Sequence, residues 1–252
     1  MSRTIIITGA TGKFGKILVG KFIDNGDIVI AVGRSINLLE NLKFDINRNN
    51  ENLYLVQTDL MVDDSISKVI KSINNYGLQP DSLINNARNL DYLKLNKEGR
   101  ASSENFLNEF KLGVVVPYQF TMSLADAFKK SFKNVLNIGS IYGSVVPNLN
   151  LYDNPNNDSS IQYGVTKSAL EKLTKELSVR LAKKSIRVNC AAFGGLESQN
   201  NDKFKKRYSN LCPSGRMLNE NDIFGPINML LSENTNSVTG HVLMIDGGWT
   251  LW

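Results

Sequence analysis

The chain has 252 residues, of which 42% are hydrophobic and 21% are charged, and its formal net charge at pH 7 is +5. This composition is that of an ordinary globular domain, and no apolar run approaches the roughly 20 residues that a membrane-spanning helix needs. Two cysteines and one histidine are too few for a disulfide framework or a metal site. The one dense basic cluster, 203–207, is too short for nucleic acid, so we expect anionic small molecules as partners.

In chain order, a β-like run begins at Thr4, which leaves no room for a signal peptide, and we expect a cytosolic protein. Runs rich in β-branched residues predict strands at 3–8, 27–32, 53–58, 82–85, 134–138, 186–192 and 242–245. Amphipathic stretches predict helices at 14–25, 64–75, 103–112, 116–131, 160–183 and 220–232. Residues 28–32 are apolar throughout, which is typical of parallel strands buried on both faces. The alternation predicts one α/β domain over 1–252, a doubly wound parallel sheet with helices on both faces.

The first predicted strand continues directly into a glycine-rich turn, Thr8-Gly9-Ala10-Thr11-Gly12-Lys13-Phe14-Gly15, and then a helix. Gly9 permits a tight turn, Gly12 lets the backbone approach a pyrophosphate, and Gly15 lets the helix pack closely on the strand. The helix N-terminus adds unpaired N–H groups and a positive dipole end. Glycine-rich turns can also merely connect elements. After the first strand of a β-α-β unit, however, this turn predicts the dinucleotide site of a Rossmann fold.

The end of the second strand indicates which dinucleotide binds. The strand ends in Val32-Gly33-Arg34-Ser35, without the carboxylate that holds the ribose 2′-hydroxyl of NAD. The planar guanidinium of Arg34 can form two hydrogen bonds to a 2′-phosphate, and the Lys13 ammonium can add a second positive charge. We therefore predict NADP(H) rather than NAD(H). The alternative is that both side chains are solvated surface cations.

A tyrosine and a lysine at helical spacing predict acid–base chemistry. Tyr163 and Lys167 lie four residues apart at the start of the long helix 160–183, so they share one face. A nearby ammonium lowers the pKa of a phenol from about 10 toward working pH, which makes Tyr163 a usable general acid or base. Ser140 ends a strand at the carboxyl edge of the sheet, where it can hydrogen-bond a reacting carbonyl oxygen.

Together these residues resemble the short-chain dehydrogenase/reductase family over essentially the whole chain. Asp59-Leu60 matches the pair beside the adenine, and Asn85-Asn86-Ala87 matches the segment that supports the cofactor. Ile186-Arg187-Val188-Asn189 and Asp246-Gly247-Gly248 match a late strand and the C-terminal signature. A further set of residues resembles a subgroup found with bacterial surface-glycan and flagellin-glycan sugar pathways. The set is Asn-Asn-Ala-Arg at 85–88, Ser140-Ile141-Tyr142-Gly143, Pro147, and Met217-Leu218 with Asp222-Ile223.

The resemblance implies a role for each catalytic residue. Tyr163 would exchange a proton with the substrate oxygen, Lys167 would hold the nicotinamide ribose and Ser140 would steady the substrate. It also implies a homodimer or homotetramer built partly from the long helices. The expected cofactor-binding residues are Gly9, Thr11, Gly12, Lys13, Phe14, Gly15, Arg34, Ser35, Asp59, Leu60, Asn86, Ala87, Tyr163, Lys167 and Gly194.

The chain departs from the family pattern in several places. Gly113 stands where the family has a catalytic asparagine that holds a water of the proton relay, so another side chain or a rerouted water must serve here. Arg88 replaces the usual glycine after Asn-Asn-Ala, and Phe193 replaces a usual proline. The polar stretch 147–160 lengthens the connection between Ser140 and Tyr163.

These departures bear on the substrate. The Asn, Asp and Tyr residues of 147–160 predict a hydrogen-bonding lip over the site, within substrate-side segments at about 141–160 and 194–220. Arg88 and Tyr152 are candidate substrate contacts, although Arg88 could instead form a structural ion pair, and the cluster 203–207 could pair with a phosphate. We expect an enzyme that interconverts a carbonyl and a secondary alcohol on a small polar, sugar-like substrate, phosphorylated or nucleotide-linked sugars included. The alternatives are a 3-oxoacyl-thioester reductase of fatty-acid type and a non-enzymatic NADP-binding sensor or regulatory protein.

Overall fold

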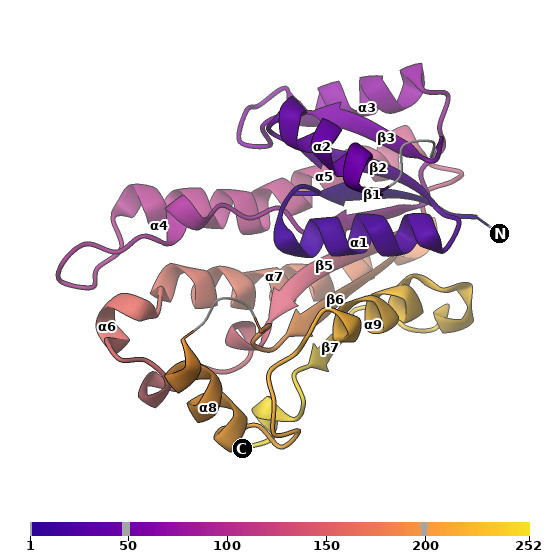
Figure 1. The fold of residues 1–252 in the computed structure, drawn as a ribbon. Helices are drawn as coiled ribbons and strands as arrows, with labels where there is room; N and C mark the ends of the chain where they lie inside the picture. Colours follow the sequence, from indigo (N-terminus) through magenta and orange to yellow (C-terminus); the bar gives the residue numbers. More distant parts are fainter. Residues whose placement is uncertain (1, 47–50, 198–200) are drawn as a thin grey trace.

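The computed structural model describes residues 2–46, 51–197 and 201–252. Its seven parallel strands form one sheet in the order β3-β2-β1-β4-β5-β6-β7 (Figure 1). The strands are β1 (Thr4–Thr8), β2 (Ile28–Gly33), β3 (Leu53–Gln57), β4 (Ser82–Asn85), β5 (Asn134–Ser140), β6 (Arg187–Phe193) and β7 (Val242–Ile245). The strand order reverses between β1 and β4, and such a switch point is where open α/β sheets bind ligands. All seven predicted strands are confirmed.

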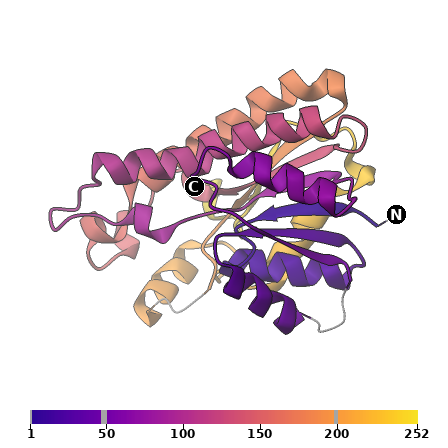
Figure 2. The ribbon, with the colours of Figure 1, turned by 90° about the horizontal axis from the view of Figure 1, so that it is seen from above.

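Helices cover both faces of the sheet, as Figure 2 shows. One face carries α1 (Lys13–Asp24), α2 (Ile36–Ile46) and α9 (Asn221–Leu231). The other carries α3 (Ser65–Asn75), α5 (Val116–Ala127) and α7 (Ile161–Leu181), with α4 (Ser103–Phe110) joined to α5 by a π-helical turn, η2 (Lys111–Val115). Two further helices, α6 (Pro155–Asp158) and α8 (Asp202–Leu211), lie beyond the carboxyl ends of the strands (Figure 1). The predicted fold class, a doubly wound α/β sheet, is confirmed.

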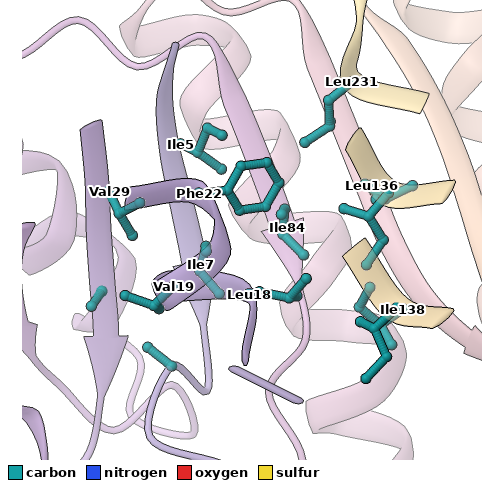
Figure 3. Packing of buried hydrophobic residues seen from close by; sticks show 14 of the residues in the cluster. Ile5, Ile7, Leu18, Val19, Phe22, Val29, Ile84, Leu136, Ile138 and Leu231 are labelled. Carbon is teal, nitrogen blue, oxygen red and sulfur yellow. The ribbon is translucent and has the colours of Figure 1, made fainter. Parts of the chain in front are cut away.

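The sheet is buried on both faces because successive side chains of each strand point to opposite sides. Ile5 and Ile7 belong to the hydrophobic cluster under α1, whereas Ile6 between them belongs to the cluster under α3 and α5. Figure 3 shows Leu18, Val19 and Phe22 of α1 packed over these strands. Burying a phenylalanine such as Phe22, which is fully buried, contributes about 1.5–3 kcal/mol, so this packing fixes the glycine turn that opens α1.

Three helices were not predicted: α2, α8 and the single turn α6. In α2 only Leu39 and Leu42 are buried, and α8 buries only Tyr208, so neither sequence carries a broad apolar stripe. The predicted helices 103–112 and 116–131 form one run that ends at Ala127. No helix within the described ranges is long and apolar enough to cross a membrane.

Candidate active site

A cavity of about 790 Å³ lies at the carboxyl ends of the strands, where the strand order reverses. Every residue that the sequence assigned to catalysis, to the cofactor or to the substrate lines it. They come from the loops that follow β1 to β6 and from the first turns of α7. The structure therefore brings the predicted site residues together around one space.

The glycine turn fits a bound pyrophosphate. Gly9 has φ +63°, and a Cβ on it would lie 2.7 Å from the Cα of Ala87. A Cβ on Gly15 would overlap the carbonyl of Gly9, so neither position accepts a side chain. Gly12 begins α1 without a side-chain cap, and a Cβ there would meet only the Gly9 carbonyl oxygen, at 3.4 Å. The first N–H groups of α1 are therefore available to an anionic group in the cavity.

The segment after β4 braces this turn. The hydroxyl oxygen of Thr8 accepts hydrogen bonds from the backbone N–H groups of Asn86, at 2.9 Å, and Ala87, at 3.0 Å. The Asn86 side chain donates to the carbonyl oxygens of Thr8, at 2.9 Å, and Gly9, at 3.2 Å. Two segments that are distant in sequence thus hold the cofactor end of the cavity in one shape.

Arg34 and Lys13, the two cations predicted to bind a 2′-phosphate, have different surroundings. Arg34 is exposed at the carboxyl end of β2 and lines the cavity, as predicted. Lys13 instead donates to the carbonyl oxygen of Glu197 at 2.8 Å, on the loop that follows β6. Lys13 also lines the cavity. That it adds a second charge to the Arg34 site stays a prediction.

Tyr163 and Lys167 lie one turn apart on α7 and both line the cavity. The Lys167 ammonium nitrogen is 5.6 Å from the centre of the Tyr163 ring, and it donates to the carbonyl oxygen of Ile138 at 2.7 Å. Ser140, at the end of β5, is buried, and its hydroxyl oxygen accepts the N–H of Tyr142 at 3.2 Å. This arrangement can supply a phenol, a cation beside it and a hydroxyl whose own proton is free to donate.

Arg88 places a second cation on the phenol. Its guanidinium carbon lies 4.7 Å from the centre of the Tyr163 ring, within the range of a cation–π contact. Arg88 is exposed, and within 2–46, 51–197 and 201–252 no ion pair holds it. The alternative of a structural ion pair therefore has no support in the described part of the chain.

The far wall of the cavity is aromatic. The Tyr142 and Tyr152 hydroxyls are hydrogen-bonded to each other at 2.9 Å, and Phe204 packs beside Tyr152 with ring centres 5.5 Å apart. The Tyr208 hydroxyl accepts the Gly195 N–H at 2.8 Å. Burial raises the pKa of Tyr208 to about 12 and raises the pKa of Tyr142 and Tyr152 as well. These phenols therefore stay protonated and can act as hydrogen-bonding groups.

The polar lip predicted for 147–160 differs from this wall. Within that stretch only Tyr152 lines the cavity, because Leu151 turns inward and the segment packs against α8. Sequence reasoning missed Phe204 and Tyr208, whose spacing of four within a basic helix was the available signal.

Two side chains of the basic cluster 203–207 form ion pairs with carboxylates of the same chain. The Arg207 guanidinium contacts Asp153 at 2.6 Å and the Leu151 carbonyl oxygen at 2.9 Å. The Lys205 ammonium pairs with Glu197 at 3.2 Å. Residues 198–200, inside the predicted substrate-side segment 194–220, lie outside the described residues. Within the described ranges, no three His, Cys, Asp or Glu side chains gather as a metal site.

Gly113 lies in the π-helical turn η2, facing α7. A Cβ there would overlap the Cγ2 methyl of Thr166, so an asparagine does not fit unless α7 shifts. Beside Gly113 a second cavity of about 10 Å³ is lined by Asn85 and Lys167, which is the space of about one water. The space that a side chain at position 113 would need is thus filled by the Thr166 methyl.

Comparisons with known proteins identify the family of the chain. Residues 3–209 match the family model described as short chain dehydrogenase. Post-translational flagellin modification protein A of Campylobacter coli is 30% identical over 254 residues, covering 99% of both chains. 3-oxoacyl-(acyl-carrier-protein) reductase FabG of Aquifex aeolicus is 26% identical over 250 residues, covering 96% of this chain and 95% of the relative.

Solved structures agree with the fold over the full length. A short chain dehydrogenase of Leptospira borgpetersenii with bound NAD+ has a TM-score of 0.86 and 27% identity, covering 99% of this chain and 93% of its own. ElxO with NADP bound has a TM-score of 0.85 and 25% identity, covering 100% of both chains. Structures similar to this chain thus hold either nicotinamide dinucleotide.

Proposed function

The chain belongs to the short-chain dehydrogenase family and is an oxidoreductase, and we propose that it uses NADP(H) to interconvert a carbonyl and a secondary alcohol on a small polar, sugar-like substrate. The observation that carries this proposal is the placement of Tyr163 and Lys167 on the same cavity as the glycine turn. Residues 1–252 then act as one dinucleotide-binding oxidoreductase domain, whose substrate-side segments are 141–160 and 194–220.

In this proposal Tyr163 is the general acid and base. A bound nicotinamide would supply or accept the hydride. Tyr163 gives its proton to the substrate oxygen during reduction and takes it back during oxidation. The Lys167 ammonium, held by the carbonyl of Ile138, stabilises the phenolate that forms. Ser140 accepts the Tyr142 N–H and donates its own proton to the substrate oxygen, which orients and polarises the carbonyl.

The cofactor end is assigned to the residues predicted from sequence. The glycine turn holds the pyrophosphate on the first N–H groups of α1. Arg34 and Ser35 receive the 2′-phosphate, because β2 ends in a cation and not in a carboxylate. The remaining contacts are assigned to Asp59, Leu60, Asn86, Ala87 and Gly194, which line the same cavity.

The substrate end supports a compact polar ligand with an apolar face. Tyr142 and Tyr152 offer hydroxyl groups on aromatic rings, a surface on which a sugar ring can both stack and form hydrogen bonds. Arg88, which has no ion pair among the described residues and lies over the Tyr163 ring, offers its guanidinium to an anionic substituent. The similarity to a flagellin modification protein agrees with a sugar substrate. The similarity to 3-oxoacyl reductases keeps an acyl thioester as the second candidate.

A homodimer or homotetramer in the cytosol completes the proposal. Leu107 on α4 is 69% exposed and Val179 on α7 is 75% exposed, and Tyr118, Ile161 and Val165 add exposed apolar surface on the same helical layer. Such a surface favours contact between copies of the chain. Cys190 and Cys212 are free thiols, which suits a reducing compartment.

The test is a screen for NADPH oxidation with keto-sugars, their phosphorylated and nucleotide-linked forms, and acetoacetyl thioesters. Tyr163→Phe should abolish turnover and leave NADPH affinity nearly unchanged, because only the phenolic oxygen is removed. Tyr118→Phe on the exposed face of α5 is the matched control and should keep full turnover. Faster reduction of acetoacetyl thioesters than of every keto-sugar would favour the acyl reductase. NADPH binding without turnover of any carbonyl would favour a sensor.

A further inference from the structure

The polar segment 147–160, from which only Tyr152 lines the cavity, forms a surface on which α8 packs. Leu151 is fully buried and belongs to one hydrophobic cluster with Tyr208 of α8, which is 1% exposed. The Tyr152 ring lies beside Phe204 of α8, with ring centres 5.5 Å apart. Two consecutive residues of the segment therefore pack with both aromatic side chains of this helix.

The Asp153 carboxylate adds polar contacts with α8. One of its oxygens accepts from the Arg207 guanidinium at 2.6 Å, and the other accepts from the side-chain amide of Asn201 at 3.4 Å. Asn201 caps α8, because its side-chain oxygen accepts the Phe204 N–H at 2.7 Å. The Arg207 guanidinium also donates to the carbonyl oxygen of Leu151 at 2.9 Å. The segment thus contacts the cap of α8 as well as its apolar face.

The helix α8 depends on such contacts because its own apolar surface is small. It has ten residues, of which only Tyr208 is buried, and an isolated helix of that length is marginal in water. Towards the core, the Tyr208 ring stacks on Trp249 with ring centres 4.2 Å apart, and its hydroxyl accepts the Gly195 N–H. The packing of Leu151 and the ion pair of Asp153 are the contribution of 147–160 to the position of this helix.

The segment 147–160 is itself fixed to the chain between β4 and α4. The Ser160 hydroxyl, at the end of the segment, donates to the carbonyl oxygen of Leu93 at 2.6 Å. Gly99, with φ +72°, approaches so closely that a Cβ on it would lie 2.5 Å from the carbonyl oxygen of Asn156. Because neither contact involves α8, the segment is a surface that is held independently of the helix it supports.

The position of α8 determines the shape of the substrate end of the cavity. Phe204 and Tyr208 line the cavity together with Tyr142 and Tyr152. In the proposed function the same cavity, of about 790 Å³, holds a dinucleotide as well as the substrate. A pocket of this size ordinarily takes one drug-sized ligand, so the space left beside a dinucleotide suits a compact substrate.

We propose that the segment 147–160 is a docking platform for α8, and that Leu151 and Asp153 are positioning residues that hold the aromatic wall in place and so favour a compact substrate over a long chain. The inference rests on the proposed function, because it takes the substrate to lie at this wall. Neither Leu151 nor Asp153 lines the cavity, so both act through α8.

The first experiment measures amide hydrogen exchange in 202–211 by mass spectrometry, without substrate. Leu151→Ala should speed this exchange at least roughly tenfold, because it leaves a cavity under the helix. The matched control is Leu149→Ala in the same turn, η4 (Leu149–Leu151), since Leu149 is 49% exposed. The control should change the exchange less than about twofold. Unchanged exchange in α1 shows that the remaining fold is intact.

A second variant tests the polar contact without changing the apolar packing. Asp153→Asn should speed exchange in α8 by roughly two- to fivefold, because a half-exposed ion pair contributes less than a buried leucine. Arg207→Gln should have a smaller effect in the Asp153→Asn background than in the wild type, because the two side chains share one contact.

The second experiment tests the role of the wall in substrate choice. NADPH oxidation is followed with acetoacetyl and 3-oxodecanoyl thioesters, and the wild type should have the higher kcat/KM with the shorter one. Leu151→Ala should raise KM for the shorter thioester with little change in kcat, and should reduce the preference between the two at least roughly tenfold. Its NADPH affinity should stay near that of the wild type, because the glycine turn lies on other elements.

Three results would overturn the proposal. Exchange in α8 that is unchanged by Leu151→Ala, or that Leu149→Ala speeds equally, would contradict the platform. Faster exchange with an unchanged preference between the two thioesters would contradict its role in substrate choice. The exchange measurements need no substrate, so they decide the platform even if the chain reduces no carbonyl, a result that would count against the proposed function alone.

Discussion

The contact between Gly113 and Thr166 predicts a strong coupling between these two positions. A Cβ on Gly113 would overlap the Cγ2 methyl of Thr166, and the next atom is the Thr166 Cβ at 3.8 Å. Thr166 is fully buried on α7, and β-branched side chains are stiff at χ1, so the methyl cannot move aside cheaply. Thr166→Ser removes only that methyl. Gly113→Ala should therefore be unfavourable in the wild type and tolerated in a protein that already carries Thr166→Ser.

The size of the coupling follows from two opposing terms. Overpacking a filled site costs about 1–3 kcal/mol, whereas replacing a helical glycine by alanine stabilises by about 0.5–1 kcal/mol. Gly113→Ala alone should thus lower the free energy of unfolding by up to about 2 kcal/mol, and in the Thr166→Ser background it should raise it by up to about 1 kcal/mol. The assay is urea unfolding of the four proteins of the double-mutant cycle. Additivity within about 0.5 kcal/mol would refute the predicted overlap.

Two further predictions concern charge. Arg34→Asp should weaken NADPH binding at least about tenfold more than NADH binding in fluorescence titrations, because a charged hydrogen bond contributes about 1.5–3 kcal/mol; equal weakening would remove the argument for NADP(H). Burial raises the pKa of Asp27, but hydrogen bonds from Arg3, the shortest at 2.6 Å, bring it below the usual 3.8. A lowered carboxyl pKa stabilises the fold above the unfolded-state value and loses that effect as the pH falls through the folded value. Asp27→Asn should therefore lower Tm at neutral pH, and the difference should shrink in acid; a constant difference would contradict this assignment.

The sheet and its cofactor turn were predictable because they depend on local patterns. Strands buried on both faces must be apolar throughout, as in 28–32, and a glycine turn between strand and helix has a fixed spacing. Tyr163 and Lys167 were predictable for the same reason, since one helical turn determines that they share a face. Helices α2 and α8 were missed because their burial comes from only one or two residues each.

The sequence by itself determined the order of the elements, the residues at the carboxyl ends of the strands and the phenol–ammonium pair. Only the tertiary structure decided the contact of Lys13 with Glu197, the aromatic wall that joins Tyr142 to Tyr152, and the burial of Glu109 in α4. The physical reason is that helical and strand periods act over a few neighbouring residues. Which side chains meet across a cavity depends on how helices and loops from distant parts of the chain pack onto the same sheet.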